Sequence, residues 1–131
     1  MFYNVYEVII LDNLFWKDET HKEDYDKILA KFEREYFDSC YNSFAYLVSA
    51  TGKTNDILNY LSPIGVAGSE IKKMLENSGY SKSERNLVLF ALQLFSSTMS
   101  DIIFHDVVSS LDSHNYKCVY QAIQIRYGEP K

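Results

Sequence analysis

The sequence has few of the residues that build disulfide scaffolds, metal sites or flexible linkers. Its 131 residues include only two cysteines, two prolines and five glycines. Cys40 and Cys118 lie far apart, without a Cys-x-x-Cys motif or a histidine at metal-ligand spacing, so we expect two reduced and mostly buried thiols. The sequence shows no internal repeat, low-complexity segment or long linker, so a single domain over residues 1–131 is predicted.

Long apolar runs and an excess of positive charge are also lacking. No stretch of about 18 apolar residues occurs, so no membrane-spanning helix is predicted. Residues 8–11 are apolar, but no basic region precedes them and no small-residue cleavage site follows, so we expect no signal peptide and a cytoplasmic protein. The net charge of −5 argues against direct nucleic-acid binding, because phosphate groups require a basic surface.

Aromatic residues, in contrast, are abundant. Eleven Tyr, eight Phe and one Trp make up 15% of the chain. A core of this size cannot enclose all of these rings, so several tyrosines should lie at the surface. Tyrosine offers a large contact area with few rotatable bonds and a polar tip, and it is enriched in protein interfaces. The composition therefore favours an exposed, tyrosine-rich contact surface.

Residues 81–97 form the segment around which we expect the chain to fold. Ser81 and Glu84 have the spacing of a capping box, in which each side chain bonds the backbone N–H of the other residue. Apolar residues then occupy nearly every side of the helix, and such a helix is stable only between other helices. The predicted fold is therefore an all-α, single-domain orthogonal bundle of about six helices around this buried central helix, with a short N-terminal strand or arm.

Capping and turn residues place the remaining helices. A second capping box, Thr20–Glu23, opens a helix that we expect to run through about Tyr36, and Asp38 or Ser39 begins another that ends near Gly52. Shorter helices are predicted from Thr54 or Asn55 to Ser62, from a Ser69 cap over residues 70–77, and over residues 101–111. Residues 64–68 are expected to be a small-residue connector. Asp112 caps the last helix, where apolar and tyrosine residues recur every three or four positions: Tyr116, Val119, Tyr120, Ile123 and Tyr127.

Residues 1–16 show the weakest helical pattern in the chain. They are rich in β-forming residues but alternate poorly between apolar and polar side chains. A single strand needs a partner, so the segment either pairs with another chain or packs as an irregular or helical arm. We therefore predict an N-terminal arm, residues 1–16, followed by a helical bundle, residues 20–127.

Candidate sites for chemistry are weak. His21, His105 and His114 have no common spacing, and His21 is expected to be solvent-exposed at a helix start. Residues 17–38 hold eight carboxylates against five basic groups, a face that could meet a basic partner, although the interspersed lysines favour a simple solvated surface. No catalytic, metal-ligating or cofactor-binding residue is predicted, and no cofactor is expected.

Three blocks of the chain resemble a family of small uncharacterised proteins from Firmicutes and their phages. The blocks are residues 21–29, residues 44–50, and a set of positions between Ser81 and Tyr127 that includes Arg85, Leu111-Asp112, Asn115-Tyr116 and residues 122–127. The resemblance implies a phage or mobile-element protein in a Gram-positive host. It supplies no catalytic residue, because the family has none assigned.

We therefore expect a non-enzymatic protein-binding module that binds a host protein, such as a nucleic-acid enzyme with a basic groove. An inhibitor of a bacterial defence system, for example an anti-CRISPR protein, would fit this setting. The residues predicted to contact the partner are Phe2, Tyr3, Tyr6, Glu7, Asp12, Trp16, Glu19 and Asp24. The alternatives are a homodimer that pairs through residues 1–14 and a small enzyme with an unrecognised site.

Overall fold

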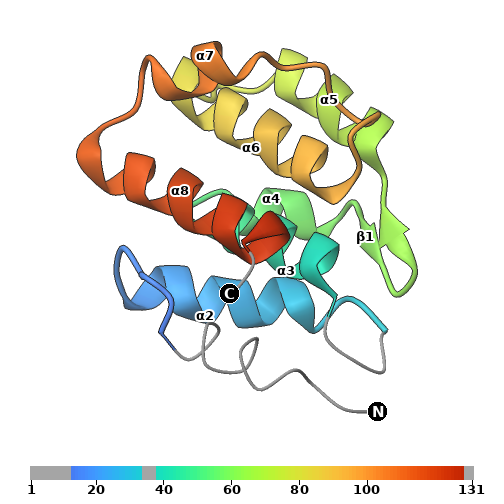
Figure 1. The fold of residues 1–131 in the computed structure, drawn as a ribbon. Coiled ribbons are helices and arrows are strands. Elements are labelled where there is room, and N and C mark those ends of the chain that lie inside the picture. Colours follow the sequence, from blue (N-terminus) through green and yellow to red (C-terminus); the bar gives the residue numbers. More distant parts are fainter. Residues whose placement is uncertain (1–12, 34–37, 129–131) are drawn as a thin grey trace.

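The structure, a computed structural model, describes residues 13–33 and 38–128 and is mainly helical (Figure 1). The described part of the chain contains seven helices and one two-stranded antiparallel hairpin. The predicted all-α class is therefore confirmed. None of the described helices has the length and apolar character needed to cross a bilayer. The elements are α2 (Glu19–Leu29), α3 (Ser39–Ser49), α4 (Thr54–Leu58), β1 (Leu61–Ser62), β2 (Gly65–Val66), α5 (Gly68–Glu76), α6 (Lys82–Phe95), α7 (Phe104–Val108) and α8 (Ser113–Tyr127).

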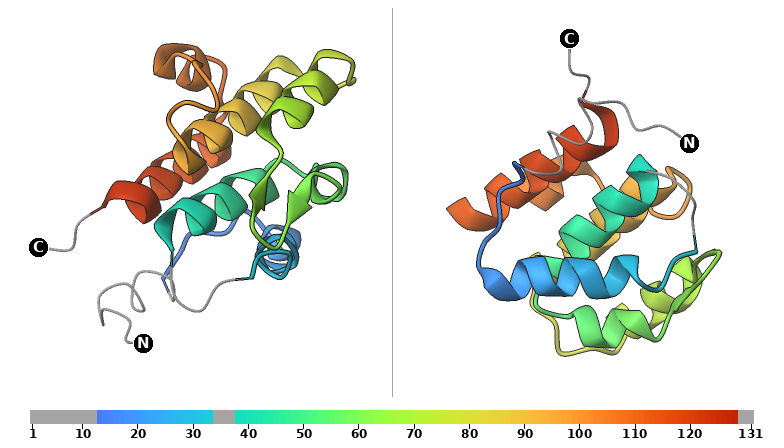
Figure 2. Two further views of the ribbon diagram at one scale, coloured as in Figure 1. Left: turned by 90° about the vertical axis from the view of Figure 1, so that its right-hand side faces the viewer. Right: turned by 90° about the horizontal axis from the view of Figure 1, so that it is seen from below.

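Helix α3 lies innermost, and α2, α6 and α8 pack around it (Figure 2). Every residue from 42 to 49 is buried. The Asp38 carboxylate caps the helix by accepting from the Cys40 N–H at 2.9 Å. Gly52, with a φ of +75°, follows the last turn in the left-handed conformation that favours glycine. The predicted start and end of this helix are confirmed.

Helix α6 has the predicted capping box but is not the centre of the fold. Ser81 Oγ accepts from the Glu84 N–H at 3.1 Å, and the Ser81 N–H donates to Glu84 Oε1 at 2.9 Å. Leu89 and Phe95 remain half-buried, because α6 packs against α3 on one side and the short α5 and α7 on others. The prediction of a bundle centred on residues 81–97 is thus not confirmed.

Helix α2 begins and ends earlier than predicted. Asp18 rather than Thr20 is the N-cap, and its Oδ1 accepts from the His21 N–H at 2.8 Å. The helix stops at Leu29, and the Glu33 N–H then donates to Pro63 O at 2.8 Å, which ties the following turn to the hairpin. The predicted Thr20–Glu23 capping box and the extension towards Tyr36 are therefore wrong, although residues 34–37 themselves lie outside the described part.

The short elements differ most from the prediction. Residues 61–66, expected to be helix end and connector, pair as β1 and β2, with Leu61 opposite Val66 and Ser62 opposite Gly65. The predicted caps of α4 and α5 are also wrong. Thr54 is the first residue of α4 and points inward, and α5 begins at Gly68 with no side-chain cap. Helix α7 covers only five residues, whereas Asp112 caps α8 as predicted.

The predicted N-terminal arm also overlaps the core. Leu14 is buried, and Phe15 and Trp16 pack against the core cluster. The Phe15 N–H donates to Gln121 Oε1 at 3.0 Å, which joins this segment to α8. Residues 14–16 therefore belong to the body of the protein, whereas residues 1–12 lie outside the described part.

The position of α3 can be tested by two leucine truncations. Leu47 in α3 is fully buried, and Leu89 in α6 is half-buried. We predict that Leu47→Ala lowers the free energy of unfolding by about 2–5 kcal/mol, because it leaves a cavity that cannot collapse. Leu89→Ala should lower the free energy of unfolding by less than about 2 kcal/mol, because it removes less buried apolar surface. Urea denaturation of both variants measures this, and an equal or reversed order would contradict the central place of α3.

Candidate functional site

Five of the eight predicted contact residues cannot be placed. Phe2, Tyr3, Tyr6, Glu7 and Asp12 lie outside the described residues. Nearly all of residues 1–14, the segment predicted to pair two copies of the chain, also lies outside the described residues. Those two predictions therefore remain predictions.

The other three predicted contact residues do not form one surface. The Trp16 ring is half-buried and packs against His21, Tyr25 and Tyr46, with ring centroids 4.9, 5.2 and 5.5 Å away. Asp24 is buried, with its Oδ1 3.6 Å from Lys27 Nζ. Glu19 is exposed. Of the three, only Glu19 presents most of its side chain to a partner.

His21 is buried, and the expectation that it would be exposed is wrong. Its Nδ1 accepts from the Lys17 N–H at 3.1 Å, and its Nε2 lies 2.9 Å from Tyr46 O. This geometry fits the neutral ring with its proton on Nε2, and burial lowers the pKa of His21 accordingly. His21 therefore links the segment before α2 to α3 and is not available as a surface ligand.

The aromatic cluster beside His21 is structural. The Tyr46 hydroxyl donates to Phe15 O, and burial raises the pKa of this hydroxyl. Burial also raises the pKa of the neighbouring Cys118 thiol to about 11, so this cysteine stays protonated at neutral pH and is a poor nucleophile. Lys17 Nζ donates to Ala50 O at 2.8 Å and to Asn115 Oδ1 at 3.0 Å. Together these bonds hold residues 15–21 against α3 and α8.

Helix α8 presents an exposed aromatic surface to solvent. Tyr116, Tyr120 and Tyr127 are 56%, 60% and 58% exposed. Because their spacings are four and seven residues, they lie on one side of the helix together with half-buried Ile123. We call these four residues the tyrosine face. Cys118, Ala122 and Ile125 lie on the opposite side of α8 and pack into the core, and the buried Val119 lies between the two sides.

The charges of α8 are all positive. Lys117 and Arg126 lie on the helix, and its residues 113–127 include no Asp or Glu. Arg126 Nε donates to Leu94 O at 2.9 Å, and its guanidinium carbon lies 4.6 Å from the centre of the Tyr127 ring. Lys117 is exposed, with Nζ 5.4 Å from the centre of the Phe15 ring. The tyrosine face is thus bordered by positive charge on a protein whose net charge is −5.

The three- and four-residue spacing of the α8 tyrosines with Val119 and Ile123 does not by itself separate exposed from buried positions. The signal that could have done so is a second series on the same helix: Cys118, Ala122 and Ile125 also recur at four and three residues. That series contains small and aliphatic side chains only, which pack closely against neighbouring helices. The tyrosines fall on the other side, where a polar tip can reach water.

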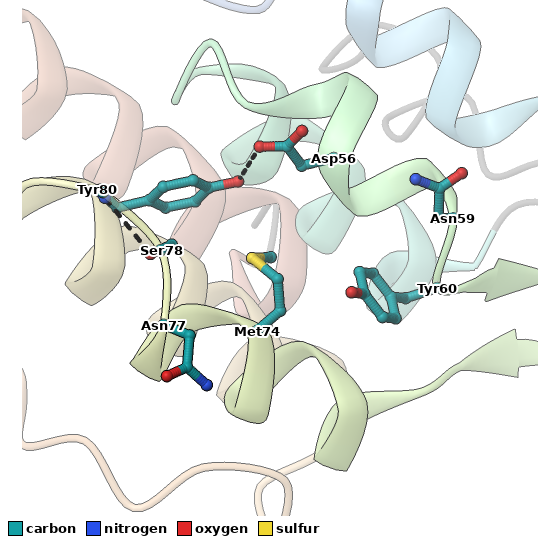
Figure 3. A pocket seen from close by; sticks show the side chains of 8 residues that line it. Asp56, Asn59, Tyr60, Met74, Asn77, Ser78 and Tyr80 are labelled. Carbon is teal, nitrogen blue, oxygen red and sulfur yellow. Dashed lines mark hydrogen bonds between the residues drawn. The ribbon is translucent and has the colours of Figure 1, made fainter.

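A pocket of about 440 Å³ lies on another part of the surface, between α4, α5 and the residues that follow α5 (Figure 3). The Tyr80 ring is buried, and its hydroxyl donates to Asp56 Oδ2 at 2.7 Å. Burial and the Asp56 carboxylate together raise the pKa of this hydroxyl, so Tyr80 remains a donor. The lining residues are Asp56, Asn59, Tyr60, Met74, Asn77, Ser78, Gly79 and Tyr80.

Among the described residues, no three His, Cys, Asp or Glu side chains gather in a way that could hold a metal ion. Comparisons with protein-family models, with curated proteins and with solved structures find no match for this chain. The tyrosine face and the pocket are two surfaces of the described residues that could bind a partner or a ligand.

The buried state of His21 makes a prediction about pH. Because the folded protein holds His21 neutral with a lowered pKa, its contribution to stability should be complete above pH about 6.5 and should be lost as pH falls through the lowered pKa. We predict that His21→Gln reduces the free energy of unfolding by about 1–3 kcal/mol at pH 7.5. The difference between the variant and the wild type should narrow as the pH is lowered.

Urea denaturation at several pH values measures this difference. The control is His105→Gln, at an exposed position, which should change the free energy of unfolding by less than about 0.5 kcal/mol. A difference for His21→Gln that stays constant from pH 7.5 to acidic pH would contradict a neutral, buried His21.

Proposed function

We propose that this protein is a non-enzymatic protein-binding module and that the tyrosine face of α8 is its contact surface. The observation that carries the proposal is the exposure of Tyr116, Tyr120 and Tyr127, each more than half exposed on one side of a 15-residue helix. Tyrosine is enriched in protein interfaces and in their hot spots, because it buries a large area at a small cost in conformational entropy. A helix face of this kind suits a groove on a partner protein.

The charges around the tyrosine face indicate the chemistry of the partner. Lys117 is exposed beside it, and Arg126 lies at its C-terminal end. A complementary surface would have an apolar centre for the rings and acidic groups at its edge. The same charges disfavour self-association through α8, because two copies would bring like charges together.

The resemblance of three sequence blocks to small proteins of Firmicutes and their phages supports a protein of a bacterial host cell as this partner. Inhibition of a host defence system, in the manner of an anti-CRISPR protein, is the biological role that we propose for such binding. A compact module with an exposed aromatic helix needs no chemistry of its own to act in this way, because occupying a partner's surface is sufficient.

A second candidate contact surface lies on α2. Glu19, Glu23 and Asp26 are all exposed, and their spacing of four and three residues places them on one side of the helix. We call these residues the acidic stripe. It supports the alternative that the partner is a nucleic-acid enzyme with a basic groove. Lys22 and Lys27 lie close to the stripe, and their positive charges weaken its negative electrostatic potential.

Two matched triple variants test these surfaces against each other. The first is Tyr116→Ser, Tyr120→Ser and Tyr127→Ser, and the second is Glu19→Gln, Glu23→Gln and Asp26→Asn. Photo-crosslinkers placed at Lys117 and, separately, at Lys22 in the host cell identify a partner, and its affinity for each purified variant is then measured. We predict that the tyrosine variant weakens binding at least about 100-fold, because interface tyrosines commonly contribute more than 1 kcal/mol each.

The acidic-stripe variant should change the affinity by less than about threefold, as expected outside the contact surface. Both variants alter exposed side chains and should keep the circular dichroism spectrum of the parent protein. The reverse order of effects would replace the tyrosine face by the acidic stripe. If the tyrosine variant binds its partner as tightly as the parent protein, the proposed function of α8 is wrong.

A further inference from the structure

We propose that the pocket between α4 and α5 is a binding site for an organic cation, an alkylammonium or guanidinium group. The site is separate from the tyrosine face and does not depend on the function proposed for it. It combines a carboxylate, two aromatic rings, a thioether and two amide side chains around one hollow (Figure 3). Each of these groups attracts or accommodates positive charge or its N–H donors.

The carboxylate of Asp56 is the charged group of the pocket. Its Oδ2 accepts from the Tyr80 hydroxyl at 2.7 Å, which fixes the orientation of the carboxylate. In the part of the chain that the structure describes, the ion pairs join Lys27 to Asp24, Lys53 to Glu84 and Lys73 to Glu70, and none of them involves Asp56. Asp56 is exposed at the rim of the pocket, so its carboxylate can accept further hydrogen bonds from a cationic ligand that replaces water there.

Lys53, which lies over the Tyr80 ring, does not replace such a ligand. Lys53 Nζ lies 4.9 Å from the centre of the Tyr80 ring and 3.9 Å from Glu84 Oε2, so its charge is balanced by Glu84. Lys53 does not line the pocket. The negative charge of Asp56 is therefore the one that a ligand in the pocket would meet first.

The walls of the pocket suit a flat or slender cation. Tyr80 is buried and held by its hydroxyl, Tyr60 stands across the pocket from it, and Met74 lies between them (Figure 3). The faces of tyrosine rings attract cations within about 6 Å, and because Lys53 already lies over Tyr80, Tyr60 is the ring that a ligand would meet. Asn77 Nδ2 donates to Lys73 O at 3.4 Å, which leaves the amide oxygen as an acceptor. The hollow of about 440 Å³ is open to solvent, with Asp56, Asn59, Asn77 and Gly79 exposed at its rim, so it would cover one side of a ligand.

The same chemistry could come from a free polyamine-like molecule or from an arginine side chain of a peptide. Agmatine, which carries both an ammonium and a guanidinium group, is the first probe, and N-acetyl-arginine amide, which carries only the guanidinium group, is the second. Glucose serves as a neutral, hydrogen-bonding comparison. Side-chain amide signals of Asn59 and Asn77 in NMR spectra of the full chain report binding at the pocket itself.

Three variants accompany the titrations. Asp56→Asn removes the charge but keeps an acceptor for the Tyr80 hydroxyl, and Tyr60→Leu removes one aromatic wall. Glu76→Gln is the matched control, since Glu76 is an exposed carboxylate of α5 that does not line the pocket. Unchanged melting temperatures of all three variants establish that any loss of binding is local.

We expect saturable shifts of the Asn59 and Asn77 signals with one or both cations and none with glucose. Asp56→Asn should weaken binding at least about tenfold, whereas Glu76→Gln should change it less than about twofold. Tighter binding of N-acetyl-arginine amide than of agmatine would identify a peptide arginine as the ligand, and the reverse would identify a free dication of the agmatine type. Any of three results would overturn the proposal. They are an equal loss of cation affinity in Asp56→Asn and Glu76→Gln, binding of glucose alone, and the absence of saturation with either cation.

Discussion

Burial of a helix that carries no charge is the constraint on which the rest of this structure depends. Helix α3 contains no Asp, Glu, Lys or Arg, and other helices cover it on several sides. Buried hydroxyl and amide groups are costly unless they are hydrogen-bonded. Ser43 and Ser49 meet this requirement within the helix, by donating to Cys40 O and Tyr46 O. Asn42 accepts from the Tyr25 hydroxyl of α2. Helices α2, α6 and α8 are thus arranged so that together they bury α3.

The surfaces of the outer helices follow from the same arrangement. Helix α8 packs on α3 through its small and aliphatic residues, so its tyrosines must face solvent. Helix α2 packs through Tyr25 and Ile28, which leaves the acidic stripe outside. The two candidate contact surfaces are therefore not additions to the fold. Each is the remaining side of a helix whose other side is used to bury α3.

The sequence predicts the parts of this fold that depend on local patterns. The all-α class, the start of α3 at Asp38, the capping box of α6 and the Asp112 cap of α8 all follow from short-range spacing, and all are confirmed. The N-cap of α2 does not follow from short-range spacing, because Asp18 and Thr20 are both residue types that cap helices well. In the structure Asp18 caps the helix, and the same turn buries His21 against Tyr46, a contact between distant residues.

The centre of the fold was also beyond local patterns. Helix α6 has a long uninterrupted apolar run over residues 87–92, but Leu89 and Phe95 stay partly uncovered, whereas the serines of α3 are buried with their hydroxyls bonded to the helix backbone. The length of an apolar run therefore did not identify the innermost helix. The pocket was missed because it brings together Asp56 and Tyr80, which are distant in sequence.

The packing of Leu14, Phe15 and Trp16 has a practical consequence for any shortened form of the protein. A chain trimmed to start at the first helix would lose the cover of Tyr46 and leave core rings open to water, so expression of a soluble fragment calls for a first residue no later than Asn13.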